Sequence, residues 1–248
     1  MNSMALMVCP HDTAGNPLKW FQFAYHITKY GHYSTKYHPC LDFTEFHEKM
    51  SESDIIYASP QDSLTMLENH HYVPVARSVN LYDEIVFIAN HDVANDSLAV
   101  MNGSECLSCN SMLVTRVGIK GLLAKGITPK RIYSETNWMA VLKAVSQGKK
   151  PYGFVYKDFY DGLSDLSKSM VTKLGETQER SIFHCVLMKN DHQDKSDSIA
   201  QILLEMHNDA KGSDVIKDID IERFITVSGD EILEFNSLFA LGSDIMEE

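Results

Sequence analysis

The stretch GSECLSCNSML (103–113) holds the residues whose types and spacing most readily support chemistry. Cys106 and Cys109 form a Cys-x-x-Cys pair, a spacing that occurs in metal sites and in thiol redox sites. A zinc site of this type needs further ligands, and Cys40 and the histidines are scattered without ligand spacing. We therefore interpret Cys106 and Cys109 as buried or half-buried free thiols. Thiol-based ligand sensing and a disulfide or redox role remain as alternatives.

Asn110 and Ser111 follow this pair directly, at the start of a helical pattern over 111–126. The first backbone N–H groups of a helix have no partner within the helix, and they bind anions readily. The same stretch therefore also predicts an anion-binding turn.

Catalytic patterns are sparse elsewhere in the chain. The sequence contains His-Asp pairs at 11–12 and 91–92, each at the expected end of a strand. General acid–base catalysis needs a third partner that these pairs do not supply, so we interpret both as structural. Gly-rich phosphate loops, G-x-S-x-G and H-E-x-x-H are all missing from the sequence. We expect a protein that is not an enzyme and uses no cofactor or metal.

Composition narrows the class of protein further. The 248 residues are 44% hydrophobic and 23% charged, which suits a globular protein with a full core. The net charge of −12 argues against a nucleic-acid binder. Five cysteines, an odd number, favour a reducing compartment. Because the sequence has no signal-peptide pattern and no membrane-length apolar run, we expect no membrane insertion and a cytoplasmic location. A periplasmic location is expected instead if a signal segment was removed.

Strands and helices alternate along the chain, which predicts an α/β fold. Strong turn signals support this reading, such as Asn16-Pro17 before one helix and Pro60 at the start of another. The strands expected in the first part of the chain span 5–10, 32–37, 54–59, 72–77 and 82–90.

Two long apolar strands, 82–90 and 181–189, bracket a self-contained α/β segment. This arrangement predicts two lobes joined by two crossing strands. Lobe one would comprise 1–82 plus 190–248, and lobe two would comprise 88–180.

Three segments resemble one known family. They are SDIIYASPQDSLTMLE (53–68), YDEIVFIANHD (82–92) and ETNWMAVLKAVSQGKKPYGFVYKDFYDGL (135–163). In order and spacing they are similar to the phosphate-, phosphite- and phosphonate-binding proteins of the type II periplasmic binding protein fold, over roughly residues 5–190. The resemblance implies a clamshell of two α/β lobes that holds a ligand in the cleft and closes by a hinge motion.

The resemblance also implies which residues meet the ligand. In lobe one they are His11, Tyr57, Ser59 and Tyr82, and in lobe two they are Asn110, Ser111, Thr136, Asn137, Tyr156 and Asp158. Tyrosine suits such a place because its ring adds apolar area and its hydroxyl a hydrogen bond. In the family a run of Ser and Thr with a Gly opens the helix at the anion site. Here that run reads CNSML and retains Ser111, so we leave the ligand class at a small polar anion.

The sequence thus predicts a solute-binding protein that serves uptake or sensing. Its expected partners are a small anion or polar metabolite and either an ABC permease or a signalling partner. Two alternatives remain open: an arsenite or metal sensor that uses Cys106 and Cys109, and a cytosolic enzyme built on the same fold.

Overall fold

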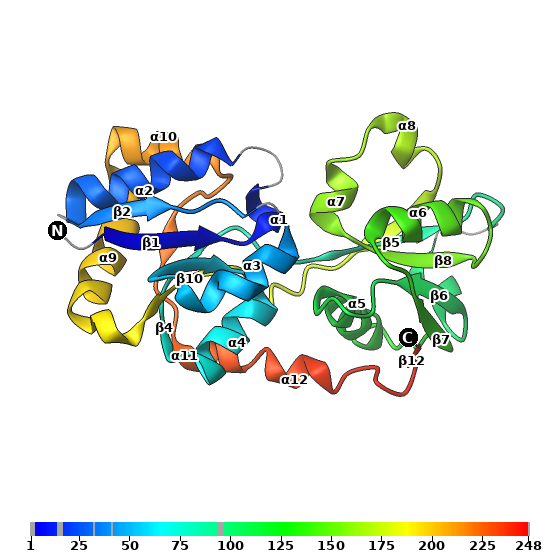
Figure 1. Cartoon of the computed structure of the whole chain (residues 1–248). Coiled ribbons are helices and arrows are strands. Elements are labelled where there is room, and N and C mark those ends of the chain that lie inside the picture. The colour runs from blue at the N-terminus through cyan, green and yellow to red at the C-terminus, as the bar shows by residue number, and fades with distance from the viewer. Residues whose placement is uncertain (1–2, 14–16, 32, 41, 94–96, 248) are drawn as a thin grey trace. The chain divides into compact units, whose positions relative to one another are not determined.

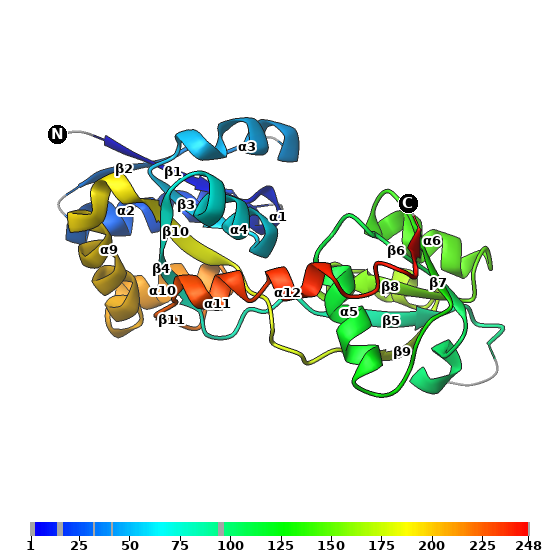
Figure 2. The same cartoon turned by 90° about the horizontal axis from the view of Figure 1, so that it is seen from below.

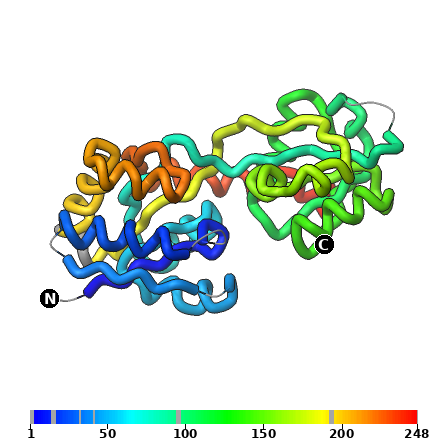
Figure 3. The backbone as a smooth tube through the Cα atoms, turned by 90° about the horizontal axis from the view of Figure 1, so that it is seen from above, coloured from blue at the N-terminus to red at the C-terminus, as the bar shows by residue number. Residues whose placement is uncertain are grey.

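The computed structural model describes residues 3–13, 17–31, 33–40, 42–93 and 97–247. Its contacts divide the chain into two units. Unit 1 comprises Met1–Leu81 and Phe183–Phe235, and unit 2 comprises Tyr82–Ile182 and Asn236–Glu248. The tube in Figure 3 shows this division by colour: the green middle of the chain and its red C-terminal end form unit 2.

Unit 1 is built on a six-stranded mixed sheet with the strand order β11-β4-β10-β3-β1-β2. Strands β1, β2 and β3 run parallel, whereas β10 is antiparallel to both β3 and β4. The strands span Ser3–Val8 (β1), Ser34–Tyr37 (β2), Ile55–Ala58 (β3), Tyr72–Ser78 (β4), Cys185–Lys189 (β10) and Phe224–Ile225 (β11).

Helices cover both faces of this sheet, with α2 and α10 on one side and α3 and α4 on the other (Figure 1). Alternate residues of β1 follow this division, because Leu6 and Val8 pack with Trp20 and Phe23 of α2 in one core cluster. The helices are Pro10–Thr13 (α1), Leu18–Gly31 (α2), Phe43–Lys49 (α3), Pro60–Asn69 (α4), Gln193–Glu205 (α9), Ala210–Asp218 (α10) and Gly229–Leu233 (α11).

Unit 2 has a second six-stranded sheet, in the order β12-β7-β6-β8-β5-β9. Strands β6, β7 and β8 are parallel, and β5 runs antiparallel to β8. The strands span Ile85–Ala89 (β5), Glu105–Ser108 (β6), Arg131–Ser134 (β7), Tyr152–Tyr156 (β8), Thr172–Glu176 (β9) and Met246–Glu247 (β12).

The helices α5 and α6 lie on opposite faces of this second sheet (Figure 1). Close packing explains two glycines here: a Cβ on Gly118 of α5 would lie 2.9 Å from Phe154, and one on Gly153 of β8 would lie 2.8 Å from Val145. The helices are Val114–Leu123 (α5), Trp138–Ser146 (α6), Lys157–Asp161 (α7), Asp165–Lys168 (α8) and Asn236–Phe239 (α12).

The predicted α/β class is confirmed, and two details of the prediction are corrected. The crossing strands expected over 82–90 and 181–189 are shorter, and each lies in one sheet: β5 in unit 2 and β10 in unit 1. Residues 236–248, expected in lobe one, instead belong to unit 2, because β12 pairs with β7 there (Figure 2). A two-residue strand carries too little periodicity to be recognised in sequence.

No helix among the described residues is both long enough and apolar enough to cross a membrane.

Candidate functional site

The carboxyl ends of β6, β7 and β8 meet at one edge of the unit 2 sheet. Ser108 pairs with Ser134 at the ends of β6 and β7. Tyr156 ends β8 opposite Ile85, the first residue of the antiparallel β5. The predicted ligand residues of unit 2 lie next to these strand ends in the chain: Asn110 and Ser111 after β6, Thr136 and Asn137 after β7, Tyr156 and Asp158 at and after the end of β8, and Tyr82 just ahead of β5. Open α/β sheets bind their ligands at such edges.

Two helices begin at this edge. Strand β6 leads through residues 109–113 into α5, whose N-cap residue Leu113 offers no side-chain hydrogen bond to the helix. Ser111 is exposed in this turn, and Thr115 closes it by donating its hydroxyl to the Cys109 carbonyl over 2.8 Å. No side chain caps α5, but the amides of Thr115 and Arg116 already donate to the carbonyls of Met112 and Leu113. The Ser111 hydroxyl and the positive end of the helix dipole therefore suit an anion here.

Strand β7 leads into α6 through Thr136 and Asn137, both exposed. Asn137 is the N-cap of α6, since its Oδ1 accepts from the amide of Ala140 over 2.9 Å. Its Nδ2 donates to the Thr136 hydroxyl over 3.3 Å. The Asn137 side chain therefore stabilises the helix start and orients the Thr136 hydroxyl beside it.

The side chain of Asn110 connects two strands of the unit 2 sheet. Its Nδ2 donates to the carbonyl of Ile132 over 2.9 Å and to that of Glu247 over 2.6 Å. The side chain therefore ties together β7 and β12, and both of its amide protons are used within the protein.

Tyr156 is buried at the end of β8, and its hydroxyl lies between two carboxylates. It is 3.2 Å from Oδ1 of Asp83 and 2.9 Å from Oδ2 of Asp158. A phenol has one proton, so it donates to only one of the two at a time. Tyr82, which directly precedes Asp83, is half-buried, with the Arg180 guanidinium 5.9 Å from its ring.

The predicted residues of unit 1 lie at the corresponding edge of the first sheet, but they are not equivalent. Tyr57 is the next-to-last residue of β3 and is 1% exposed, whereas His11 is exposed in α1. Ser59 is the N-cap of α4: it donates to the Asp62 carboxylate over 2.6 Å and accepts from the Asp62 amide over 3.2 Å. The Ser59 hydroxyl is thus engaged in capping.

His184 lies at this same edge, and sequence reasoning missed it. It directly precedes β10, and its Nδ1 lies 2.8 Å from Oδ2 of Asp12. Its ring centroid is 5.8 Å from that of Tyr57 and 5.9 Å from that of His11. Because β10 is antiparallel to β3, its first residues meet the carboxyl end of β3. Knowing that β10 is antiparallel to β3 would have placed His184 at this edge, but the sequence does not reveal the direction of a strand.

The two cysteines of the Cys-x-x-Cys pair are free and buried. Burial raises the pKa of Cys106 and of Cys109 to about 12, with the carboxylates of Glu105 and Glu135 as second causes. Both thiols are therefore protonated at neutral pH, a poor state for metal binding or redox chemistry. Among the described residues, no group of three His, Cys, Asp or Glu side chains could hold a metal ion.

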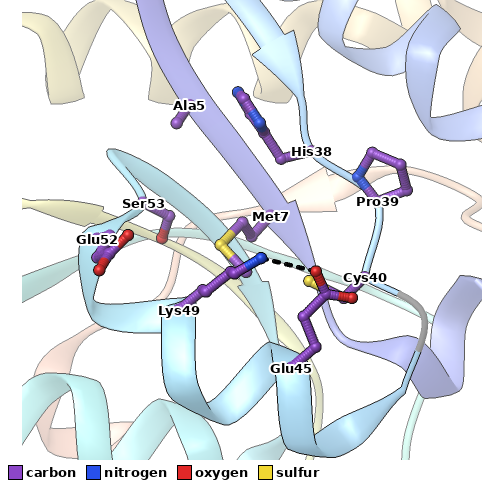
Figure 4. A pocket seen from close by; sticks show the side chains of 9 residues that line it. All are labelled: Ala5, Met7, His38, Pro39, Cys40, Glu45, Lys49, Glu52 and Ser53. Carbon is purple, nitrogen blue, oxygen red and sulfur yellow. Dashed lines mark hydrogen bonds and ion pairs between the residues drawn. The ribbon is translucent and has the colours of Figure 1, made fainter.

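A surface pocket of about 250 Å³ lies on the α3 side of unit 1 (Figure 4). In its lining, Nζ of Lys49 lies 2.7 Å from Oε1 of Glu45. None of the predicted ligand residues lines it, so we assign it no part in ligand binding. The lining consists of Ala5, Met7, His38, Pro39, Cys40, Glu45, Lys49, Glu52 and Ser53.

Comparison with solved structures identifies the class of proteins that share this fold. PhnD1 from Prochlorococcus marinus MIT 9301, in complex with methylphosphonate, matches with a TM-score of 0.70 and 12% identity over 95% of this chain and 96% of that one. The periplasmic aliphatic sulphonate-binding protein SsuA from Escherichia coli matches with a TM-score of 0.64 and 11% identity over 98% and 87%. The fold is thus that of two-lobed periplasmic binding proteins.

A third solved structure, a binding protein component of an ABC phosphonate transporter from Pseudomonas aeruginosa, matches with a TM-score of 0.69 and 15% identity over 96% and 85%. The sequence matches no curated protein.

The family model described as "ABC transporter, phosphonate, periplasmic substrate-binding protein" matches residues 8–232. The chain belongs to this family, which confirms the resemblance. Its role is that of a solute-binding protein for a small anionic ligand, and the family is the periplasmic component of ABC transporters. The thiol-sensor and enzyme alternatives find no support in these comparisons, and neither does a signalling partner.

Proposed function

We propose that this protein binds a small oxyanion of the phosphonate or sulfonate class in the periplasm and delivers it to an ABC permease. The family supplies the transporter context. Among the solved relatives, PhnD1 is in complex with methylphosphonate, and SsuA is an aliphatic sulphonate-binding protein. Both ligands carry a tetrahedral acid group with several acceptor oxygens, which needs several donors at once.

The observation that carries the proposal is the pair of helix starts in unit 2. The helices α5 and α6 begin after neighbouring parallel strands, and each start has an exposed hydroxyl, Ser111 or Thr136. Each also presents the positive end of a helix dipole. Together they offer amide and hydroxyl donors at one edge of a sheet, and no charged donor is required.

Other predicted residues of unit 2 would complete the contacts. Tyr82 would contribute ring surface and a hydroxyl, and Tyr156, whose hydroxyl lies between Asp83 and Asp158, would contribute ring surface. Asp158 is a carboxylate, so it would meet an amino or hydroxyl group of the ligand and not its acid group. Asn110, Asn137 and Ser59 would act indirectly, by fixing the turns in which the other residues lie.

Thermal unfolding with a panel of anions tests the proposal. The panel contains methylphosphonate, phosphate, methanesulfonate, sulfate and acetate. A ligand at 100 times its Kd stabilises the folded state by about 2.7 kcal/mol. For a chain of this length that corresponds to a rise in Tm of about 5–10 °C. If no phosphonate or sulfonate raises Tm, the proposal is wrong.

Two variants locate the contacts. Ser111→Ala and Thr136→Val should each weaken binding of the best anion by about ten- to a hundredfold, the cost of one lost hydrogen bond to a charged group. Ser146→Ala is the matched control, because its hydroxyl bonds the Lys143 carbonyl at the opposite end of α6. Equal affinities in all three variants would contradict the assigned site.

A further inference from the structure

The described residues after Phe235 form the C-terminal segment of unit 2, 236–247. The segment contains α12 and β12, and β12 pairs with β7 at the edge of the sheet (Figure 2). It contains no predicted ligand residue, but it is hydrogen-bonded to the turn 109–113 and to α5. Ser111, the proposed anion donor, lies in that turn. The segment is therefore bonded to the structure on both sides of the donor.

Asn110, directly before Ser111, is held by the segment. Its Nδ2 donates to the Ile132 carbonyl on β7 over 2.9 Å and to the Glu247 carbonyl on β12 over 2.6 Å. Its Oδ1 is buried and has no hydrogen-bond partner among the described residues. The reversed amide would place Oδ1 against two carbonyl oxygens, which only accept. The attached segment is therefore compatible with one orientation of the Asn110 side chain.

Arg116 is bonded to the segment on the other side of Ser111. Its Nη1 donates to the Leu241 carbonyl over 2.6 Å, and its guanidinium carbon lies 5.8 Å from the centroid of the Phe239 ring. Because Arg116 belongs to α5, this hydrogen bond fixes the start of the helix, and the hydrogen bond of Asn110 fixes the turn before it. The segment thus restrains the backbone on both sides of the Ser111 hydroxyl.

An anion binds more tightly when its donors are held in place before it arrives. A loose turn must lose conformational freedom as it closes on the ligand, and that loss weakens the observed affinity. The attachment of the segment is itself modest, because β12 has only two residues and the ion pair of Arg131 with Glu247 is exposed. Such a contact opens locally more readily than a core strand does. The fraction of molecules with an ordered turn therefore depends on this attachment.

We propose that the C-terminal segment positions the anion-binding turn 109–113 through Asn110, so that anion affinity depends on the attachment of the segment to β7. The inference rests on the proposed function, because it concerns the same anion site. It assigns Asn110 as a positioning residue and the segment as the element that holds it. Coupling between two sites is reciprocal, so a bound anion strengthens the attachment by the same factor by which the attachment raises the affinity.

Native-state hydrogen exchange of the wild-type protein, with and without anion, tests this coupling. The probes are methylphosphonate and methanesulfonate, each added at saturating concentration. The Ile132 amide donates to the Ile245 carbonyl over 2.8 Å, so its exchange reports detachment of the segment. A bound anion should slow this exchange about two- to tenfold, the factor that corresponds to one net hydrogen bond. The control is the Ile127 amide, which donates to the Leu122 carbonyl near the C-terminal end of α5, and its exchange should change less.

Two variants separate the coupling from a purely structural role. Asn110→Leu keeps the approximate volume of the side chain and removes its two donated hydrogen bonds. Anion affinity, measured by calorimetry, should fall about two- to tenfold, and the anion should no longer slow exchange of the Ile132 amide. Asn102→Leu is the matched control, because the Asn102 side chain accepts from the Thr128 amide over 2.9 Å in a turn ahead of β6. This variant should keep the wild-type affinity and the wild-type slowing of exchange.

The outcomes separate this inference from the proposed function. If an anion binds but slows the Ile132 and Ile127 amides equally or not at all, the inference is wrong and the proposed function stands. If the anion speeds exchange of the Ile132 amide, Asn110 has turned from the Glu247 carbonyl to the ligand, which is equally contrary.

The Asn110 variant gives a second decision. If Asn110→Leu binds the anion and keeps the full slowing of Ile132 exchange, the coupling does not pass through Asn110 and the inference is wrong. If Asn110→Leu does not fold, the wild-type comparison of Ile132 with Ile127 decides. If the wild-type protein binds neither anion, both proposals are wrong.

Discussion

Replacing Gly242 by alanine should loosen the C-terminal segment from unit 2. Gly242 has a φ of +70°, and a Cβ there would lie 2.5 Å from Cδ1 of Ile119 in α5. The left-handed backbone costs a residue with a side chain about 1–2 kcal/mol. Crowding against the fully buried Ile119 adds about 1–3 kcal/mol. We therefore expect Gly242→Ala to destabilise the attachment of residues 236–248 by about 2–5 kcal/mol in total.

Two other glycines provide matched controls for this substitution. Gly103 and Gly126 have φ values of +68° and +72°, and a Cβ on either one would meet no atom within 4 Å. Gly103→Ala and Gly126→Ala should therefore show only the backbone cost of about 1–2 kcal/mol. The difference between Gly242→Ala and these controls isolates the contact with Ile119. Ile119→Val removes Cδ1, so it should recover most of that difference in the double variant.

Native-state hydrogen exchange at the Ile132 amide measures the effect directly. This amide donates to the Ile245 carbonyl over 2.8 Å, and detachment of the C-terminal segment breaks that bond. A free-energy change of 1.4 kcal/mol alters the exchange rate by a factor of ten, so Gly242→Ala should speed exchange of the Ile132 amide about 30-fold or more. The controls should speed it by at most about 5- to 30-fold, which is the effect of their full backbone cost on this hydrogen bond. Exchange no faster than in Gly126→Ala would refute the steric argument, and an unchanged rate would refute the attachment itself.

Three further predictions follow from residues already described. Ser59→Ala should lower stability by about 1 kcal/mol through the lost α4 cap, with anion affinity unchanged by calorimetry; a loss of affinity at full stability would mean that Ser59 contacts the ligand. Gly153→Ala should cost about 1–3 kcal/mol in urea unfolding, because its Cβ would lie 2.8 Å from Val145, and wild-type stability would contradict this packing. Burial raises the pKa of Cys109 to about 12 in the folded state. In the unfolded state the thiol ionises at a lower pH, so the free energy of unfolding falls as pH rises from 9 towards 12. Cys109→Ala should therefore lose less stability than the wild-type protein between pH 8 and pH 10.5, and equal losses would contradict the assigned burial.

The alternation of strands and helices was predictable because local signals mark it clearly. Ser59-Pro60 starts α4 as a cap followed by proline at the first helical position, and the apolar residues Val141, Leu142 and Val145 at helical spacing form the buried face of α6. Strand ends were less predictable. Asp83 and Glu84 fall inside the apolar run 82–90, yet β5 begins only at Ile85. Pairing with β8 and β9, which no local pattern reveals, sets that boundary.

The candidate site was predictable where it depends on strand order along the chain, and not where it depends on strand direction. Ser111 and Thr136 follow parallel strands, so the rule that ligands bind at carboxyl ends places them correctly at one edge. His184 precedes an antiparallel strand, and the same rule does not apply to it. Asn110 was recognised as a turn residue, but its partner Glu247 lies 137 positions away in sequence.

The late position of β12 in the chain has a consequence for biosynthesis. Strands β5 to β9 leave the ribosome long before Met246 and Glu247, so β7 emerges with an unpaired backbone edge. The hydrogen bond from the Asn110 side-chain amide to the Glu247 carbonyl likewise forms only after residue 247 has been translated. Unit 2 therefore completes its sheet only after residues 246 and 247 have been translated. A nascent chain stalled before residue 240 would carry an open strand edge that chaperones and proteases can recognise.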